Sequence, residues 1–119
     1  MYYISKEMEI SGAHKLTLSH ASKCATLHGH NWLLTVCCKA QQLDDNGMVC
    51  DFNSIKEKIH GYLDHGYLND LLPFNPTAEN LARWVVEQIP ECYKCSVRES
   101  LGNVAVYVDE TMVSPFDPF

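Results

Sequence analysis

Segments with strand periodicity and segments with helix periodicity follow one another in a fixed order along this chain, and that order limits the folds it can adopt. Two strand segments come first, two helical segments follow, and two strand segments close the chain. Their boundaries are 2–13 and 28–40, then 53–63 and 78–89, then 93–99 and 103–110. Because short turns make consecutive strands antiparallel, the pattern predicts an α+β fold with a four-stranded antiparallel sheet and two helices on one face.

Turn and capping residues set the boundaries of several of these segments. Residues 44–47 (Asp-Asp-Asn-Gly) are typical of a turn, and we expect residues 48–50 to continue the sheet after it as a hairpin. Asp51 or Asn53 is positioned to cap the first helix, and Thr77 to cap the second. One face of such a sheet and its edges stay uncovered, which favours a homo-oligomer.

Length, charge and composition exclude several classes of protein. The chain has 119 residues, 46% of them hydrophobic, which is enough for one domain over residues 1–119. Residues 111–119 carry two prolines and are expected to form a loosely ordered tail. The net charge of −6 argues against a nucleic-acid partner, and no apolar run approaches the ~20 residues that span a membrane. The first residues show no signal-peptide pattern, so we expect a cytoplasmic protein.

Six cysteines are unusual in so short a chain. A secreted disulfide scaffold would be rich in loops and would carry a signal peptide, so reduced thiols are the better interpretation. Cys92 and Cys95 form a lone CxxC motif, a weak zinc or redox signal that we interpret as structural. Cys24 differs from the others because it lies in a polar loop just before a pair of histidines.

The strongest chemical signal is His28-Gly29-His30 at the start of the second strand. Residues i and i+2 of a strand project from the same face, so the two imidazoles can reach one point. His14, at the end of the first strand, can supply a third nitrogen if the two strands pair. Three protein ligands are typical of a catalytic zinc site. The alternative interpretation is that these are surface histidines with no ligand role.

Cys24 lies four residues before His28 and allows two interpretations. As a thiolate near a divalent cation, it would act as a base or a nucleophile. As a fourth zinc ligand, it would close a structural site that has no activity. The spacing alone does not decide between these roles.

Two further positions place a carboxylate where it could take part in chemistry. Asp64 precedes His65 just after the first helix, where it could orient the ring and tune its basicity, although adjacent side chains often point apart. Glu99 ends an apolar strand and suits a ligand with two parallel N–H donors, such as a 2-aminopyrimidinone. Taken alone, each also fits an ordinary helix end or a solvated strand edge.

Together these motifs resemble the 6-pyruvoyl-tetrahydropterin synthase superfamily, and within it the 6-carboxy-5,6,7,8-tetrahydropterin synthase family of queuosine biosynthesis. The matching blocks, in the family's order, are Ser-Gly-Ala-His-Lys-Leu at 11–16, Cys24 to His30, Gly-Met-Val-Cys-Asp-Phe at 47–52, Leu-Asp-His with Leu-Asn within 63–69, Pro-Thr-Ala-Glu-Asn-Leu-Ala at 76–82 and Val-Arg-Glu-Ser at 97–100. The resemblance thus runs from about Ile10 to Glu99. Three residues separate Cys24 from His28, which is similar to the carboxy-forming branch, whereas pyruvoyl-forming relatives place the cysteine further away.

The resemblance implies a tunnelling T-fold that assembles into a barrel, usually a hexamer. It implies zinc-dependent conversion of 7,8-dihydroneopterin triphosphate to 6-carboxy-5,6,7,8-tetrahydropterin, acetaldehyde and triphosphate. The implied residues are His14, His28 and His30 for zinc, Cys24, Asp64, His65 and Glu99 for catalysis, and Glu99 and Thr77 for the pterin, Thr77 toward a neighbouring subunit. A pyruvoyl-forming synthase on the same scaffold and a non-enzymatic zinc-binding module are the alternatives.

A triphosphate substrate conflicts with the acidic balance of the whole chain. The net charge of −6 would repel an anion, so a local positive region has to oppose it. Lys15 and Lys23 flank the loop that leads to the histidine pair, and we expect them to supply this local charge.

Overall fold

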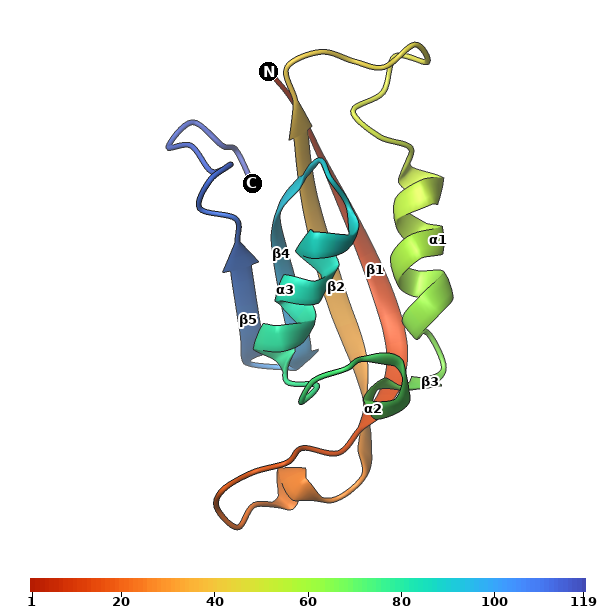
Figure 1. The fold of residues 1–119 in the computed structure, drawn as a ribbon, viewed down its shortest axis with the longest axis vertical. Helices are drawn as coiled ribbons and strands as arrows, with labels where there is room; N and C mark the ends of the chain where they lie inside the picture. Colours follow the sequence, from red (N-terminus) through yellow and green to blue (C-terminus); the bar gives the residue numbers. More distant parts are fainter.

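The computed structural model describes residues 1–119, and its centre is a five-stranded sheet with the strand order β3-β1-β2-β4-β5 (Figure 1). Two long strands come first, the helices follow, and a hairpin closes the fold. The elements are β1 (Tyr2–His14), the 3-10 helix η1 (Lys23–Ala25), β2 (His28–Ala40), α1 (Phe52–Leu63), β3 (Gly66–Tyr67), α2 (Leu68–Leu71), α3 (Ala78–Gln88), β4 (Cys92–Ser100) and β5 (Asn103–Val108). The predicted α+β class and the order of strands, helices and strands are confirmed.

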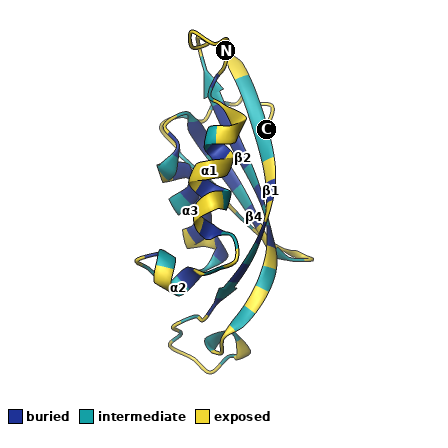
Figure 2. Ribbon diagram, turned by 90° about the vertical axis from the view of Figure 1, so that its right-hand side faces the viewer, coloured by how far each residue is buried: buried dark blue, intermediate teal, exposed yellow.

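The long helices α1 and α3 lie on one face of the sheet, and the opposite face carries no helix (Figure 2). The core fills the space between the two layers. Trp32 and Leu34 of β2, Ile59 of α1 and Val85 of α3 have no exposed surface. None of the helices is long and apolar enough to cross a membrane.

Polar side chains begin both long helices. The Asp51 carboxylate accepts a hydrogen bond from the backbone N–H of Asn53 at 2.8 Å, so Asp51 is the cap of α1. The Thr77 hydroxyl accepts from the backbone N–H of Asn80 at 3.1 Å, as predicted for the start of α3. Pro90 follows α3 closely, and its ring cannot continue a helix.

The sheet differs from the four antiparallel strands that the sequence predicts, because a fifth strand pairs with β1 in parallel. β3 lies beside Gly12 and Ala13 at the outer edge of β1. It is only two residues long, too short to show strand periodicity, and the sequence pattern therefore predicts a loop over 64–76. His65 turns the chain into β3 with a φ of 59°, in the left-handed region.

The predicted strand at residues 48–50 is wrong. The turn before it forms, with Gly47 at a φ of 80° and its N–H donating to the Asp44 carbonyl at 2.9 Å. The Asp44 carboxylate then accepts from the N–H of Met48 at 3.0 Å, and no strand follows. Both edges of β2 are already paired, with β1 and with β4, so the sheet has no free position beside it.

Two strand pairings position the candidate site residues, and only one of them keeps an unbroken register. β1 and β2 pair without a shift over their whole length, and the ladder ends at the pair His14–His28. The β4–β5 pairing shifts between Arg98 and Ser100, which makes Glu99 the extra residue of a bulge. Bulges redirect side chains, and this one lies at the same end of the sheet as the two histidines.

The end of the chain contacts the first two strands. The Asp117 carboxylate accepts a hydrogen bond from the Tyr3 hydroxyl at 2.8 Å and lies 2.9 Å from the Lys39 ammonium. The side chains of Lys39 and Asp117 are 8% and 6% exposed. These contacts attach the C-terminal segment to β1 and β2.

Replacing Gly66 with Ala is expected to destabilise the fold by about 1–3 kcal/mol, because an added methyl group overpacks the site. A Cβ there would lie 2.9 Å from the Leu63 carbonyl oxygen and 2.5 Å from a Leu71 methyl. Urea unfolding followed by circular dichroism measures the change. Gly61→Ala is the control, since its Cβ would meet nothing closer than 4.0 Å. Alanine favours the helix there, so equal losses in both variants would contradict the steric explanation.

Candidate functional site

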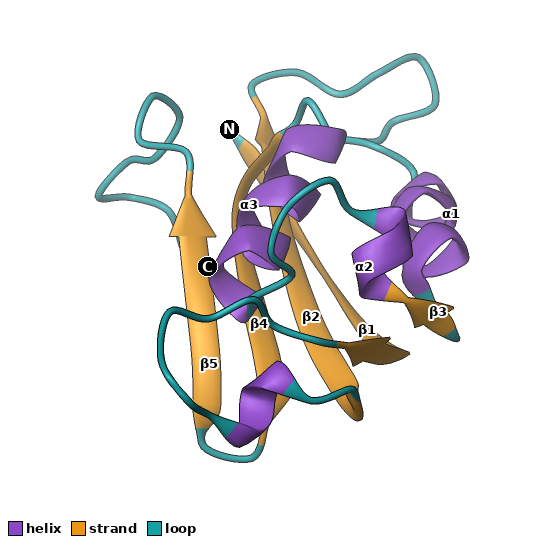
Figure 3. Ribbon diagram, turned by 60° about the horizontal axis from the view of Figure 1, so that its bottom comes forward, coloured by secondary structure: helices purple, strands orange, loops and turns teal.

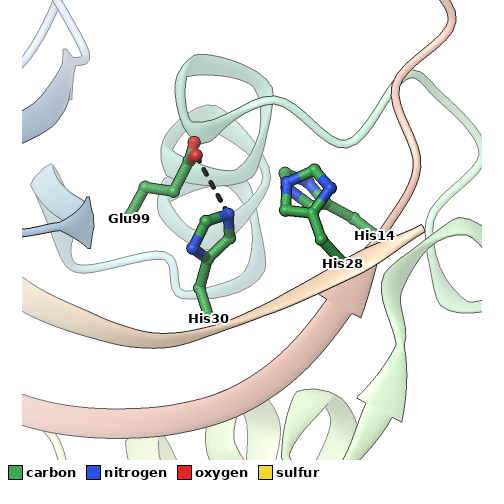
Figure 4. Close-up of side chains that lie close together, drawn as sticks. All are labelled: His14, His28, His30 and Glu99. Carbon is green, nitrogen blue, oxygen red and sulfur yellow. Dashed lines mark hydrogen bonds and ion pairs between the residues drawn. The ribbon is translucent and has the colours of Figure 1, made fainter. Parts of the chain in front are cut away.

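Four side chains gather at one end of the sheet, on the face that the helices cover. They are His14 from β1, His28 and His30 from β2, and Glu99 from β4 (Figure 4). One ligand atom from each lies within 4.8 Å of the others. Imidazole nitrogens and a carboxylate are common ligands of divalent transition metals, so this group could hold a metal ion.

The β1–β2 ladder brings the three histidines together. His14 is the direct cross-strand partner of His28, and Gly12 is the partner of His30. His28 and His30 are two residues apart on β2 and therefore share a face. The absence of a side chain at Gly12 leaves room for Trp32, whose indole N–H donates to the Gly12 carbonyl at 3.1 Å.

Two of the imidazoles are oriented by backbone carbonyls. Nδ1 of His14 lies 2.7 Å from the Pro76 carbonyl oxygen, and Nδ1 of His28 lies 2.7 Å from the Thr26 carbonyl oxygen. Since a carbonyl can only accept, both Nδ1 atoms carry the proton, and the Nε2 lone pairs of the neutral rings remain free. Such a hydrogen bond is the usual support of a histidine that binds metal through its other nitrogen.

The free nitrogens of these two rings face each other. Nε2 of His14 lies 2.9 Å from Nε2 of His28. Two lone pairs at this distance repel unless a proton or a cation lies with them. Burial lowers the pKa of His14, although its hydrogen bond to Pro76 opposes the shift. The arrangement therefore fits a metal ion.

His30 and Glu99 complete the group. Nε2 of His30 lies 3.0 Å from Oε1 of Glu99, the contact drawn as a dashed line in Figure 4. The two groups are not aligned as a hydrogen bond, so this buried nitrogen of His30 has no hydrogen-bond partner. A buried ring nitrogen without a partner is costly, and a metal ion would satisfy it. The ring of Trp32 packs in T-shaped contacts with the rings of His14 and His30, with centroids 4.9 and 5.1 Å away.

Cys24 lies beside this group without joining it. It stands in η1, where Ser22 caps the turn and accepts a hydrogen bond from the Cys24 N–H at 3.2 Å. Its thiol is not among the ligand atoms that converge. Cys24 and Glu99 instead line the same hollow of about 550 Å³, together with Ala78 of α3 and residues 102–106. A molecule in this hollow would meet both side chains.

Asp64 and His65 contact each other but lie elsewhere. The Asp64 carboxylate accepts from the backbone N–H of Ser11 at 3.0 Å and from Nδ1 of His65 at 2.7 Å. The Ser11 hydrogen bond, with a smaller contribution from His65, lowers the pKa of Asp64. Asp64 thus orients the ring of His65, whose side chain is 82% exposed.

The structure does not bring this pair to Cys24. His65 lines a different cavity, of about 410 Å³, together with Ser11 and Gly66, and His30 of the histidine group also borders it. β3 follows His65 at one edge of the sheet, whereas Glu99 lies beside β5 at the other edge (Figure 3). Within one chain, the predicted catalytic residues therefore form two separate groups.

The remaining predicted residues lie around the hollow or at its periphery. Thr77 is half-buried and uses its hydroxyl to cap α3, directly before Ala78 in the lining of the hollow. Lys15 and Lys23 are exposed, at the end of β1 and in η1. The Pro76 and Thr26 carbonyls were not predicted, because any residue type offers a carbonyl and only the folded chain places it beside an imidazole.

Comparison with known proteins identifies the family. A family model described as 6-pyruvoyl tetrahydropterin synthase matches residues 3–114, nearly the whole chain. The chain belongs to the 6-pyruvoyl tetrahydropterin synthase family. The resemblance drawn from the six sequence blocks is confirmed.

Relatives within the family support the same assignment. A protein of Synechocystis sp. named 6-carboxy-5,6,7,8-tetrahydropterin synthase is 36% identical, over 90% of this chain and 93% of that protein. A Bacillus subtilis protein of the same name is 29% identical, over 89% and 84%. The fold matches the structure of Caenorhabditis elegans 6-pyruvoyl tetrahydropterin synthase with a TM-score of 0.72 and 23% identity, covering 91% of this chain and 95% of that one.

Replacing His28 with Ala is expected to weaken metal binding by about 100-fold or more. Loss of a group that hydrogen-bonds to a metal ligand already lowers metal affinity by about 10–100-fold, and loss of the ligand itself costs at least as much. Titration of metal-free protein with zinc and with cobalt measures the affinity. His20→Ala is the control, because His20 is exposed in the loop between β1 and β2 and lies outside the group. Unchanged affinity in His28→Ala would remove this residue from the ligand set.

Proposed function

We propose that this chain is a zinc-dependent carbon–carbon lyase that converts 7,8-dihydroneopterin triphosphate to 6-carboxy-5,6,7,8-tetrahydropterin, acetaldehyde and triphosphate, in queuosine biosynthesis. The observation that carries the proposal is the placement of Cys24 and Glu99 in one hollow beside the histidine group. The names of the relatives at 29% and 36% identity support the carboxy-forming reaction. Six free cysteines fit a reducing, cytoplasmic location.

The metal we assign to the histidine group is zinc, held by His14, His28 and His30. Three imidazoles with one further position are a common ligand set for catalytic zinc. When bound, zinc would supply Lewis-acid chemistry, lowering the pKa of substrate hydroxyls and polarising a carbonyl. The chain's contribution is to hold the three Nε2 atoms together, which the carbonyls of Pro76 and Thr26 do for two of the rings.

Cys24 is the residue we assign as the base. Its position beside the metal group, but outside the converging ligand atoms, leaves the sulfur available for proton transfer. As a thiolate it would take a proton from the side-chain carbon of the pterin. Loss of that proton allows triphosphate to leave, and the carbonyl that follows allows the side chain to break by a retro-aldol step.

Glu99 is the residue we assign to the pterin ring. Its carboxylate lines the hollow and has two oxygens, of which one lies near His30. Parallel N–H donors of an aminopyrimidinone match a carboxylate in a bidentate arrangement. Thr77 at the start of α3 is assigned a further contact, to the pterin of a neighbouring subunit.

Asp64 and His65 can serve this reaction only if a second copy supplies them. His65, which Asp64 orients, lines a different cavity from Cys24, so a proton relay between the two groups needs another subunit. The short edge strand β3 and the edge strand β5 are the free edges through which copies could pair. We therefore propose a homo-oligomer, a hexamer in keeping with the family resemblance, in which each site combines residues of neighbouring chains.

Lys15 and Lys23 are assigned to the triphosphate. Both are exposed and flank the loop that leads from β1 to the histidine pair. Their charge opposes the net charge of −6 locally, where an anionic substrate would approach.

A pyruvoyl-forming synthase is the second candidate. A Dictyostelium discoideum protein named 6-pyruvoyl tetrahydrobiopterin synthase is 32% identical, over 74% of this chain and 75% of that protein. That reaction would also expel triphosphate but would keep the side-chain carbons. The two candidates therefore differ in whether acetaldehyde is released.

Purified zinc-loaded protein is expected to release acetaldehyde from 7,8-dihydroneopterin triphosphate. The Cys24→Ala substitution is expected to lower the rate of acetaldehyde release by about 10²–10⁴-fold, because it removes the general base. Liquid chromatography of the pterins together with an acetaldehyde assay measures both. Cys50→Ala is the matched control, because Cys50 is also half-buried but lies outside the hollow. A pyruvoyl pterin without acetaldehyde would establish the second candidate instead, and full activity in Cys24→Ala would refute the assigned base.

Glu99→Gln is expected to raise KM for the pterin by about tenfold or more, since a hydrogen bond to a charged group contributes about 1.5–3 kcal/mol. Zinc content is measured in parallel to separate pterin binding from metal binding. Glu79→Gln is the control, because Glu79 lines the same hollow but lies outside the metal group. A loss of zinc with unchanged KM would make Glu99 a metal ligand and not a pterin contact.

A further inference from the structure

A buried ion pair holds the C-terminal segment against the helix-free face of the sheet. Lys39 of β2 follows Cys38, a residue of the core, so the Lys39 side chain points to the opposite face. Figure 2 shows the C-terminus on this side of the sheet, away from α1 and α3. The Lys39 ammonium lies 2.9 Å from the Asp117 carboxylate, and both side chains are more than nine-tenths buried. No part of the proposed reaction uses this pair.

The groups around Asp117 form a site that suits one carboxylate. Tyr3, the cross-strand partner of Lys39, donates its hydroxyl hydrogen bond to Oδ1 of Asp117 at 2.8 Å, the same oxygen that the ammonium contacts. The ammonium also lies 4.8 Å from the centroid of the Tyr93 ring, in a cation–π contact. Burial would raise the pKa of Asp117, but its hydrogen bonds, first the one from Lys39, lower it. The carboxylate is therefore ionised at neutral pH.

Few hydrogen bonds attach the end of the chain to the sheet. The last backbone hydrogen bond to a strand runs from the N–H of Asp109 to the Tyr93 carbonyl at 2.9 Å. Beyond it, residues 110–119 reach the sheet through the two hydrogen bonds of Asp117 and a longer one of 3.4 Å from the Tyr93 hydroxyl to the Phe119 main chain. Segments with so few attachments open locally at a small cost.

Two turns give this segment a shape of its own. The Asp109 carboxylate accepts hydrogen bonds from the N–H and the hydroxyl of Thr111, at 2.9 and 2.6 Å. The second oxygen of Asp117 accepts from the N–H of Ser114 at 2.8 Å. All of these partners belong to the segment itself, so none of these bonds has to break when it leaves the sheet. The segment can therefore move as a unit about Asp109.

We propose that Lys39 and Tyr3 form a carboxylate-binding site on the helix-free face, and that Asp117 occupies this site to hold residues 110–119 over the sheet as a strap. The strap opens about Asp109 when the Asp117 carboxylate leaves, and opening exposes the Lys39 ammonium. The closed state depends on Asp117 because a buried ammonium without a partner is costly. The vacated site accepts a small carboxylate in place of Asp117.

Acetylation of amines in the full-length protein by N-hydroxysuccinimide acetate, mapped by peptide mass spectrometry, measures opening of the strap. Lys58, exposed on α1 on the other side of the sheet, is the internal reference. Asp117→Ala is expected to raise the ratio of Lys39 to Lys58 acetylation by about tenfold or more, because it removes hydrogen bonds between charged groups. Tyr3→Phe, which removes one hydroxyl and keeps the ring, should raise the ratio by a few-fold.

Chemical rescue tests the ligand class of the site. Sodium formate added to Asp117→Ala should lower the acetylation of Lys39 again, because its carboxylate takes the place of the missing one. Sodium chloride at the same concentration is the control for ionic strength and should leave the acetylation unchanged. Equal protection by formate and chloride would overturn the carboxylate site.

Glu110→Ala is the matched control variant, because it removes an exposed carboxylate from the same segment. It should react like the parent. Circular dichroism and continued protection of the buried Cys38 thiol from iodoacetamide show that the sheet stays folded in each variant. The proposal is overturned if Lys39 acetylation is unchanged in both Asp117→Ala and Tyr3→Phe, or if it rises only together with Cys38 labelling in both.

Discussion

The unbroken pairing of β1 with β2 is the constraint on which the rest of this structure depends. Each strand is 13 residues long, and no shift interrupts the ladder between them. A slip of one residue would turn every inward side chain of β2 to the opposite face. The same register therefore decides both which side chains form the core and which imidazoles meet at its end.

A single face of β2 contains both the core and the proposed metal site. Leu34 and Val36 are buried beneath the helices, and Trp32 marks the end of this apolar stretch. His30 and His28 continue the same alternation beyond it. Trp32 packs against the imidazole of His30 and limits its movement, while Nε2 of this ring faces the Glu99 carboxylate. Metal ligands on paired strands are positioned more strictly than ligands on loops.

A single chain does not bring all the proposed catalytic residues into one cavity. The hollow is lined by Cys24 and Glu99, whereas the oriented His65 lines another cavity. In the proposed homo-oligomer, pairing of copies through the uncovered sheet edges would both protect these edges and complete each site.

The sequence by itself determined the local features: the alternation of the strands, the apolar spacing of the helices, a cap at Asp51 or Asn53 and one at Thr77, and the shared face of His28 and His30. These depend on neighbours within a few residues, so periodicity and capping rules capture them. Only the tertiary structure decided that a two-residue strand joins β1, that residues 48–50 stay outside the sheet, and that Glu99 reaches His30 through a bulge. It also decided that Asp64 and His65 lie apart from Cys24. Each of these depends on contacts between distant segments, where free sheet edges and backbone register, not local residue preference, select the arrangement.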